Sequence, residues 1–241
     1  GYDTAVISGA EQALQEFFRS GLGDWYTNAL HGTVVSSALI GCIIGGLISG
    51  FMATKFGRRN SLIIASVFFF LSALGSYMPE FLFRPNLEFF QPGEATKGLL
   101  WAFVLYRVLG GVGVGMASAI CPMYIAEVAP ANIRGTLVSC NQFAIIFGQL
   151  VVYFINFMIR SGLAETPELI EIAMVNIGWR KMFLSEAFPA GTFGLLLLLV
   201  PKTPRFLVTQ GNTQQALHVL AKINGQTKAE AILQEIKDGK I

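Results

Sequence analysis

Two ionisable residues stand in segments that are otherwise apolar. Asp3 lies close to Val6 and Ile7 at the start of the chain, and Arg107 is the only charged residue in the stretch 101–116. Charged groups inside a membrane span are costly and face a bundle interior or an aqueous cavity. Desolvation and a neighbouring guanidinium act in opposite directions on a carboxylate, so a small rearrangement can switch its protonation. Asp3 and Arg107 are therefore candidate partners in a proton-carrying site, with a purely structural ion pair as the alternative.

A second group of candidates consists of side-chain amides. Gln142 and Gln149 are seven residues apart, which is two helical turns, and Asn156 continues the same face. An amide presents both donors and an acceptor, which suits neutral solutes rich in hydroxyl groups. Polar contact between neighbouring helices is the competing interpretation.

Composition places these residues in a membrane protein. The chain is 53% hydrophobic and 13% charged, whereas soluble domains carry about 25% charged residues. A net charge of +2, with no basic tract interleaved with aromatics, argues against nucleic acid. Three scattered cysteines and two distant histidines predict neither a disulfide framework nor a metal site.

Motifs for catalysis are absent from the sequence. There is no HExxH, no GxSxG and no Walker lysine, so we expect neither an enzyme nor a cofactor. Any energy source for transport is then expected to be an ion gradient.

The apolar residues are grouped into segments long enough to cross roughly 30 Å of hydrocarbon. The first segment is short and polar, and it lacks a preceding Met or basic region, so we read it as a helix whose start is missing. Glycines at intervals of four in the second segment predict close helix packing, as does the run 110–115 in the fourth. The expected helices are 1–18, 31–54, 61–78, 99–126, 137–158 and 179–200, with polar loops at 79–98 and 160–178.

Charge distribution predicts the orientation of these helices. Lysines and arginines in the short turns and after the sixth segment mark one side as cytoplasmic. Beyond residue 200, apolar residues at helical spacing in 213–224 and 228–238 predict short amphipathic helices. We therefore expect an all-α fold with a transmembrane bundle at 1–200 and a cytoplasmic helical linker at 201–241.

Several joint motifs carry a family resemblance. They are GYDTAVISG at 1–9, GFMATKFGRR at 50–59, the RxxGGxGxG run from Arg107, PMYIAEVAPANIRG at 122–135, NQFAIIFGQ at 141–149 and PKTPR at 201–205. Over essentially its whole length the chain resembles the sugar porter family of the major facilitator superfamily.

The resemblance implies a transporter of twelve helices in two six-helix halves, embedded in the cell inner (plasma) membrane. This chain would be the N-terminal half, and its partners would be the lipid bilayer and the C-terminal six-helix half of the same protein. The implied function is symport of a proton with a monosaccharide, D-xylose or a related sugar, by alternating access. A facilitative uniporter and a membrane sugar sensor are the alternatives.

The resemblance also implies roles for particular residues. Asp3 would carry the proton with Arg107 as its partner, and an acid rather than Asn at position 3 favours symport. Gln142 and Gln149 would bind sugar. The residues implied in the cytoplasmic gate are Arg58, Arg59, Glu127, Arg134 and Arg205.

Three residues fall outside this pattern. Thr54 and Lys202 depart from the family, and Lys202 reverses the charge of the usual Glu, which puts the detail of the gate in doubt. Glu186 lies within the sixth segment as a further buried acid, either at an interface or as a second titrating group.

Overall fold

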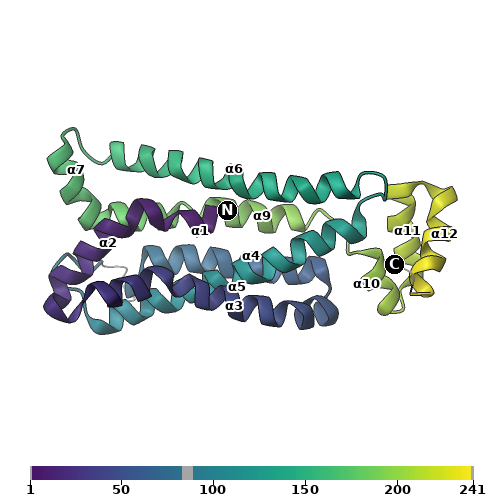
Figure 1. The fold of residues 1–241 in the computed structure, drawn as a ribbon, viewed down its shortest axis with the longest axis horizontal. Helices are drawn as coiled ribbons and strands as arrows, with labels where there is room; N and C mark the ends of the chain where they lie inside the picture. Colours follow the sequence, from purple (N-terminus) through teal and green to yellow (C-terminus); the bar gives the residue numbers. More distant parts are fainter. Residues whose placement is uncertain (1, 83–88, 240–241) are drawn as a thin grey trace.

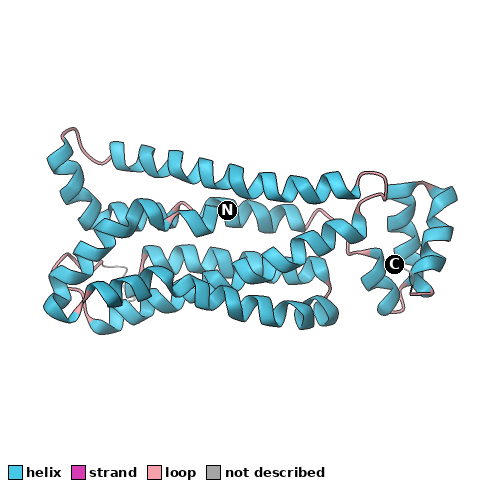
Figure 2. Cartoon of the chain, in the orientation of Figure 1, coloured by secondary structure: helices cyan, strands magenta, loops and turns pink. Residues whose placement is uncertain are grey.

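The computed structural model describes residues 2–82 and 89–239, leaving aside the side chains of Asp3, Thr4 and Leu82. This part of the chain is helical and contains no strand (Figures 1 and 2). The elements are α1 Tyr2–Ala5, α2 Ile7–Leu22, η1 Gly23–Trp25, α3 Asn28–Phe56, α4 Arg58–Tyr77, η2 Pro79–Leu82, α5 Lys97–Val128, α6 Arg134–Ser161, α7 Pro167–Ala173, the π-helical η3 Met174–Gly178, α8 Trp179–Leu184, α9 Ala187–Leu197, α10 Pro204–Thr209, α11 Thr213–Asn224 and α12 Gln226–Lys237.

The long helices run along the long axis of the molecule, and α10 to α12 lie together beyond one end of the bundle (Figure 1). We call this the α10 end and the opposite one the α7 end. Four helices, α3 to α6, are long and apolar enough to cross a membrane. Threonine side chains begin two of them: Thr27 accepts a hydrogen bond from the Leu30 amide, and Thr96 accepts one from the Leu99 amide. The predicted all-α membrane bundle is confirmed.

Two of the expected helices are interrupted. The first segment divides at Val6 into α1 and α2, and the sixth divides at Ser185 and Glu186 into α8 and α9. Ser185 and Glu186 keep right-handed helical backbone angles, so the expected helix over 179–200 is divided by a short irregular turn rather than ended there. The Ser185 hydroxyl donates to the Met182 carbonyl at 2.5 Å, a local bond that competes with regular helix geometry.

The expected loop at 160–178 is also wrong, because most of it is helical. Thr166 accepts a hydrogen bond from the Leu169 amide and Pro167 occupies the first turn of α7, a favourable start for a helix. The π-helical η3 then leads directly into α8.

Small residues bring α3 and α5 into close contact, as their spacing predicts. A Cβ atom at Gly41 would overlap the Val108 carbonyl oxygen, and one at Gly111 would overlap the Ala38 carbonyl oxygen. Gly46, by contrast, faces open space. Only one side of the glycine-rich face of α3 is therefore used within the described residues.

A layer of buried aromatic rings fills the bundle toward the α7 end. We call it the aromatic core. Its rings lie 5.1–6.4 Å apart in mostly tilted or edge-on pairs, a favourable arrangement. Its members are Phe17, Phe18, Phe103, Trp179 and Phe183.

Helices α10 to α12 pack around an apolar cluster of their own. Its buried members are Leu207, Ala216, Val219, Leu220, Ala229 and Leu233. We propose, as the sequence predicts, that residues 201–241 form a unit distinct from the bundle.

Candidate functional site

An ion pair is buried in the middle of the bundle. Arg107, in the first half of α5, donates from Nη1 to Oε1 of Glu186 at 3.2 Å, and their side chains are 2% and 3% exposed. The guanidinium also lies 5.0 Å from the centre of the Phe183 ring, which is within range of a cation–π interaction. We call this pair the ionic centre.

The ionic centre includes only one of the two residues that the sequence predicts for it. Arg107 is buried, as expected, but the partner described for it is Glu186. The side chain of Asp3 lies outside the described residues, so its pairing with Arg107 stays a prediction. Sequence alone did not assign Glu186 a partner, because the two residues are 79 positions apart.

The two interrupted helices meet beside the ionic centre. The hydroxyl groups of Tyr2, in α1, and Ser185, between α8 and α9, lie 2.6 Å apart in a hydrogen bond. Ser185 directly precedes Glu186.

A cavity of about 600 Å³ opens next to the ionic centre. Its lining includes Tyr2 and Glu186, the α6 residues Asn141 and Gln142, and the rings of Phe69 and Phe193. Ligand pockets for small molecules measure about 300–1,000 Å³, so a monosaccharide fits. The lining of the cavity therefore combines the carboxylate of the ion pair, amide groups and aromatic rings.

The two predicted sugar-binding glutamines are placed differently. Gln142 is exposed and lines the cavity, whereas Gln149 is half-buried and lies outside its lining. Both remain on the long helix α6, two turns apart.

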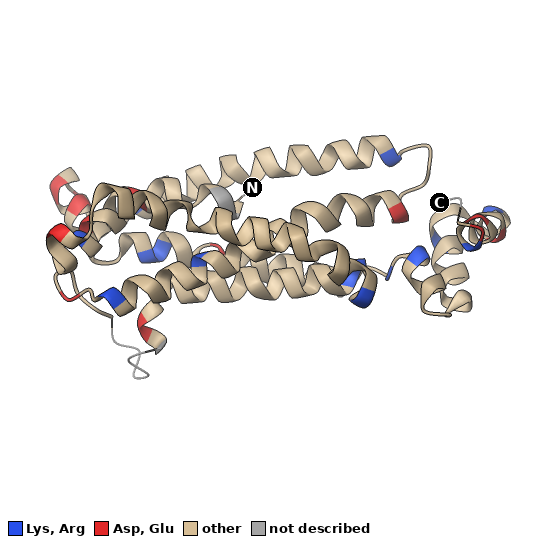
Figure 3. Ribbon diagram, turned by 60° about the horizontal axis from the view of Figure 1, so that its bottom comes forward, with Lys and Arg blue, Asp and Glu red and all other residues tan. Residues whose placement is uncertain are grey.

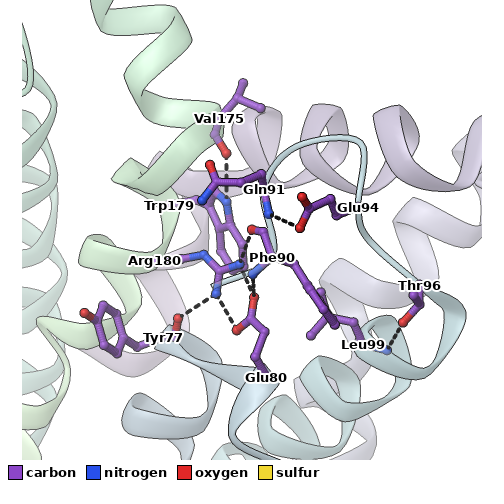
Figure 4. Close-up of polar contacts among 10 residues, drawn as sticks. All are labelled: Tyr77, Glu80, Phe90, Gln91, Glu94, Thr96, Leu99, Val175, Trp179 and Arg180. Atoms are coloured by element: carbon purple, nitrogen blue, oxygen red, sulfur yellow. Dashed lines mark hydrogen bonds and ion pairs between the residues drawn. The ribbon is translucent and has the colours of Figure 1, made fainter. Parts of the chain in front are cut away.

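A second buried ion pair lies toward the α7 end, between Arg180 of α8 and Glu80 of η2 (Figure 4). Arg180 donates to both carboxylate oxygens, to the Tyr77 carbonyl at 3.1 Å and to the Phe90 carbonyl at 3.3 Å. Glu80 in turn accepts from the Phe90 amide at 3.1 Å. Both side chains are fully buried.

Three rings surround this second pair, which we call the outer clamp. The Arg180 guanidinium carbon lies 4.5–5.2 Å from the ring centres of Trp179, Phe89 and Phe17. Sequence reasoning missed the clamp, since Glu80 lies inside an expected loop and Arg180 lies next to another, so both looked like ordinary loop charges. Their contact is a product of the tertiary fold.

Charged residues of the predicted gate gather at the α10 end. Figure 3 shows basic residues near the turns at this end of the bundle. Arg58 and Glu127 form an ion pair at 2.9 Å, and Arg58 also donates to the Ala53 carbonyl.

The other predicted gate residues do not join this ion pair. Arg59 donates to the Val200 carbonyl at 3.1 Å, and Arg134 donates to the Ala129 carbonyl at 3.2 Å. Arg205 is exposed and makes no ion pair with another described residue. Of the five predicted gate residues, Arg58 and Glu127 are thus the two that the described structure joins in an ion pair.

Long apolar helices around a buried ion pair and a polar cavity define a membrane transport protein. Residues 1–240 match the model of the family described as "Sugar (and other) transporter". The D-xylose-proton symporter of Escherichia coli (strain K12) is 49% identical over 241 residues, covering 98% of this chain and 48% of the symporter.

Solved structures give the same result. The xylose transporter XylE from E. coli in a partially occluded inward open conformation aligns with a TM-score of 0.89 at 48% identity, covering 99% of this chain and 55% of that one. The proton:xylose symporter XylE of the major facilitator superfamily, bound to 6-bromo-6-deoxy-D-glucose, aligns with a TM-score of 0.88 at 48% identity, over 98% and 49% of the two chains.

The chain belongs to the sugar (and other) transporter family, a family of transporters rather than enzymes. It has the fold of the N-terminal half of a major facilitator transporter and spans about half the length of the relatives it matches.

Proposed function

We propose that the chain forms the half of a monosaccharide:proton symporter that carries the proton and part of the sugar site. The observation that supports this most directly is the ionic centre of Arg107 and Glu186, buried beside a cavity that Gln142 also lines. The identity to a D-xylose-proton symporter makes D-xylose or a related sugar the proposed substrate. The proposed location is the cell inner membrane, with multiple spans.

Proton coupling follows from the need to keep Arg107 paired. A guanidinium stays charged at any physiological pH, and an unpaired buried charge is strongly destabilising. We propose that Asp3 binds the proton. When Asp3 is neutral, Glu186 pairs with Arg107 as observed, and when Asp3 is ionised it competes for the same guanidinium.

Sugar binding is assigned to the amide face of α6. Gln142 offers donors and an acceptor to sugar hydroxyls, and the rings of Phe69 and Phe193 line the same cavity. Gln149 is proposed as a second contact that α6 brings to the sugar when the halves close. The remaining contacts would come from the C-terminal six-helix half.

Alternating access requires that the α10 end open and close. We propose that Arg58, Arg59, Glu127, Arg134 and Arg205 hold this end shut in the outward-facing state through contacts with the other half. One proton moving down 100 mV supplies about 2.3 kcal/mol. That energy corresponds to roughly forty-fold accumulation of sugar.

Asp3→Asn in the full-length protein tests the proposal. In proteoliposomes, we expect sugar exchange without a gradient to persist and uphill uptake driven by a pH gradient to disappear. Asp24→Asn, which changes an exposed acid in η1, is the matched control and should behave as wild type. Unchanged accumulation in Asp3→Asn would remove Asp3 from the mechanism.

A facilitative uniporter is the alternative in the same family. It predicts that adding sugar to a lightly buffered cell suspension causes no alkalinisation of the medium. A symporter predicts a sugar-dependent rise in external pH.

A further inference from the structure

Among the described side chains, Asn156 makes the buried polar contact between helix α6 and the first span. Along α6 the described buried residues are Val152 and Asn156. Asn156 is 5% exposed and donates from Nδ2 to the Val6 carbonyl at 3.1 Å. This amide is therefore the polar link between the helix of the sugar-binding glutamines and the helix of Asp3.

The carbonyl that accepts this bond lies where the first span is interrupted. Val6 separates α1 from α2, and its own amide donates to the Tyr2 carbonyl at 3.1 Å. The Tyr2 hydroxyl then bonds Ser185, the neighbour of Glu186. Three hydrogen bonds, joined by the backbone of Val6 and the side chain of Tyr2, thus link Asn156 to Ser185, which directly precedes Glu186.

The first span is shaped to receive Asn156. A Cβ atom at Gly9 would overlap the Asn156 amide group. The amide borders a small cavity of about 180 Å³, lined also by Ser8 and Tyr153, and its Oδ1 is buried without a hydrogen bond from the described residues. A buried acceptor without a partner is costly. Asn156 therefore bears a cost at Oδ1 while its Nδ2 makes the hydrogen bond to the Val6 carbonyl.

Asn156 also belongs to the sugar-binding face of α6. It follows Gln142 and Gln149 at the same spacing of seven residues, so all three lie along one side of the helix over about 21 Å. A sugar that holds Gln142 in place fixes α6. Any tilt of α6 then acts on α1 at the point where Asn156 holds Val6.

We propose that Asn156 is a positioning residue that couples sugar binding on α6 to the ionic centre, through its hydrogen bond to the interruption between α1 and α2. The proposal rests on the proposed symport. It assigns Asn156 no contact with sugar or proton, and it predicts that loss of the bond uncouples the two without abolishing either.

The test uses Asn156→Leu in the full-length protein in proteoliposomes. Leu is similar in size but cannot donate, so α1 loses its link to α6. We expect proton uptake per sugar and uphill accumulation to fall roughly five-fold or more, the size of a typical coupling between sites. Exchange of D-xylose without a gradient, and its KM, should stay within about two-fold of wild type.

Gly9→Ala probes the same contact from the opposite helix, since the added Cβ displaces the Asn156 amide. It should lower coupling in the same direction. Ser8→Ala is the matched control, because Ser8 borders the same small cavity but bonds only the Ala5 carbonyl of its own segment.

Wild-type proton uptake per sugar in Asn156→Leu would overturn the proposal, and so would an equal loss of exchange and accumulation, which marks a merely structural role. If Asn156→Leu does not reach the membrane, Gly9→Ala becomes the test. Wild-type proton uptake per sugar in Gly9→Ala would then overturn the proposal. Asp3→Asn in the same assay separates the hypothesis about Asp3 from the one about Asn156. If Asp3→Asn leaves proton coupling intact, the proposal that Asp3 carries the proton is wrong, and the proposal about Asn156 is judged on its own variants.

Discussion

The bundle holds two buried arginine–glutamate pairs that differ in how completely they are enclosed. In the outer clamp, Arg180 donates to both oxygens of Glu80 and to two backbone carbonyls, within a shell of three rings. In the ionic centre, Arg107 donates to Glu186 through one nitrogen, beside a cavity. The chemical groups are the same, and their surroundings are not.

This difference separates a structural role from a switching role. A buried ion pair is stable when further hydrogen bonds satisfy its remaining donors and acceptors. In the clamp, both Nη atoms of Arg180 donate to Glu80 or to backbone carbonyls, and its Nε is buried without a hydrogen-bond acceptor among the described residues. Glu186 of the ionic centre lines a cavity, and we propose that Arg107 exchanges one carboxylate for another there.

Each of the two ion pairs includes one residue at or next to α8. Arg180 lies near the start of this short helix and Glu186 lies just beyond its end, while Phe183 of the aromatic core lies between them. The clamp therefore fixes one end of α8, and Glu186 is held at the other.

The largest predicted effect is the loss of stability on breaking the clamp. Glu80→Ala leaves Arg180 as an uncompensated buried charge, which costs about 3–5 kcal/mol in free energy of unfolding. The midpoint of thermal unfolding in detergent, followed by tryptophan fluorescence, should fall sharply.

The double variant Glu80→Leu with Arg180→Met is the control for this prediction. Replacing a buried pair by apolar residues of similar volume is often neutral, so the double variant should recover much of the lost stability. A Glu80→Ala protein as stable as wild type would contradict the structural role of the clamp.

A smaller loss of stability, with a larger effect on transport, is expected at the ionic centre. Glu186→Gln retains an oxygen that can accept from Arg107, and the neighbouring cavity admits water or another carboxylate. The expected cost in free energy of unfolding is about 1–3 kcal/mol, the range for a hydrogen bond to a charged group.

Transport by Glu186→Gln should be impaired out of proportion to that cost. Without Glu186 ionised, Arg107 loses its alternative partner, and we expect sugar accumulation to fall while binding of D-xylose persists. Isothermal titration with the sugar, beside proteoliposome uptake, measures both. Equal losses at Glu80 and Glu186 in stability and in transport would erase the distinction between the two pairs.

The sequence predicted the features that depend on local pattern. Apolar segments placed the four long helices, and glycine spacing predicted close packing at Gly41 and Gly111, although not that α3 and α5 would be each other's partner. Arg107 was identified because a charge in an apolar span is rare and costly. Each of these signals is contained within a single segment.

The features that sequence reasoning missed depend on contacts between distant segments. Glu80 and Arg180 are 100 positions apart, and neither stands in an apolar run that would make its burial evident. The interruption at Ser185 was missed because Leu and Phe on both sides continue the apolar pattern. At this turn Ser185 bonds Met182 and Tyr2, and Glu186 pairs with Arg107.

The smallest predicted effect extends the comparison to a third pair, Arg58 and Glu127 at the α10 end. Their side chains are 15% and 10% exposed, so water reaches this pair more readily than either pair inside the bundle. Glu127→Gln should lower the free energy of unfolding by about 1 kcal/mol or less, close to the value for solvent-accessible ion pairs.

If Glu127 helps to close the α10 end, its loss should change the conformational equilibrium more than the stability. A cysteine placed at Ser139, an exposed position on α6, should be modified faster by a membrane-impermeant thiol reagent added from the α10 side. Arg58→Gln should give the same acceleration, since either change removes the same ion pair. An unchanged modification rate in both variants would mean that the pair stabilises the turn after α3 without controlling access, which would make it a second clamp rather than part of a gate.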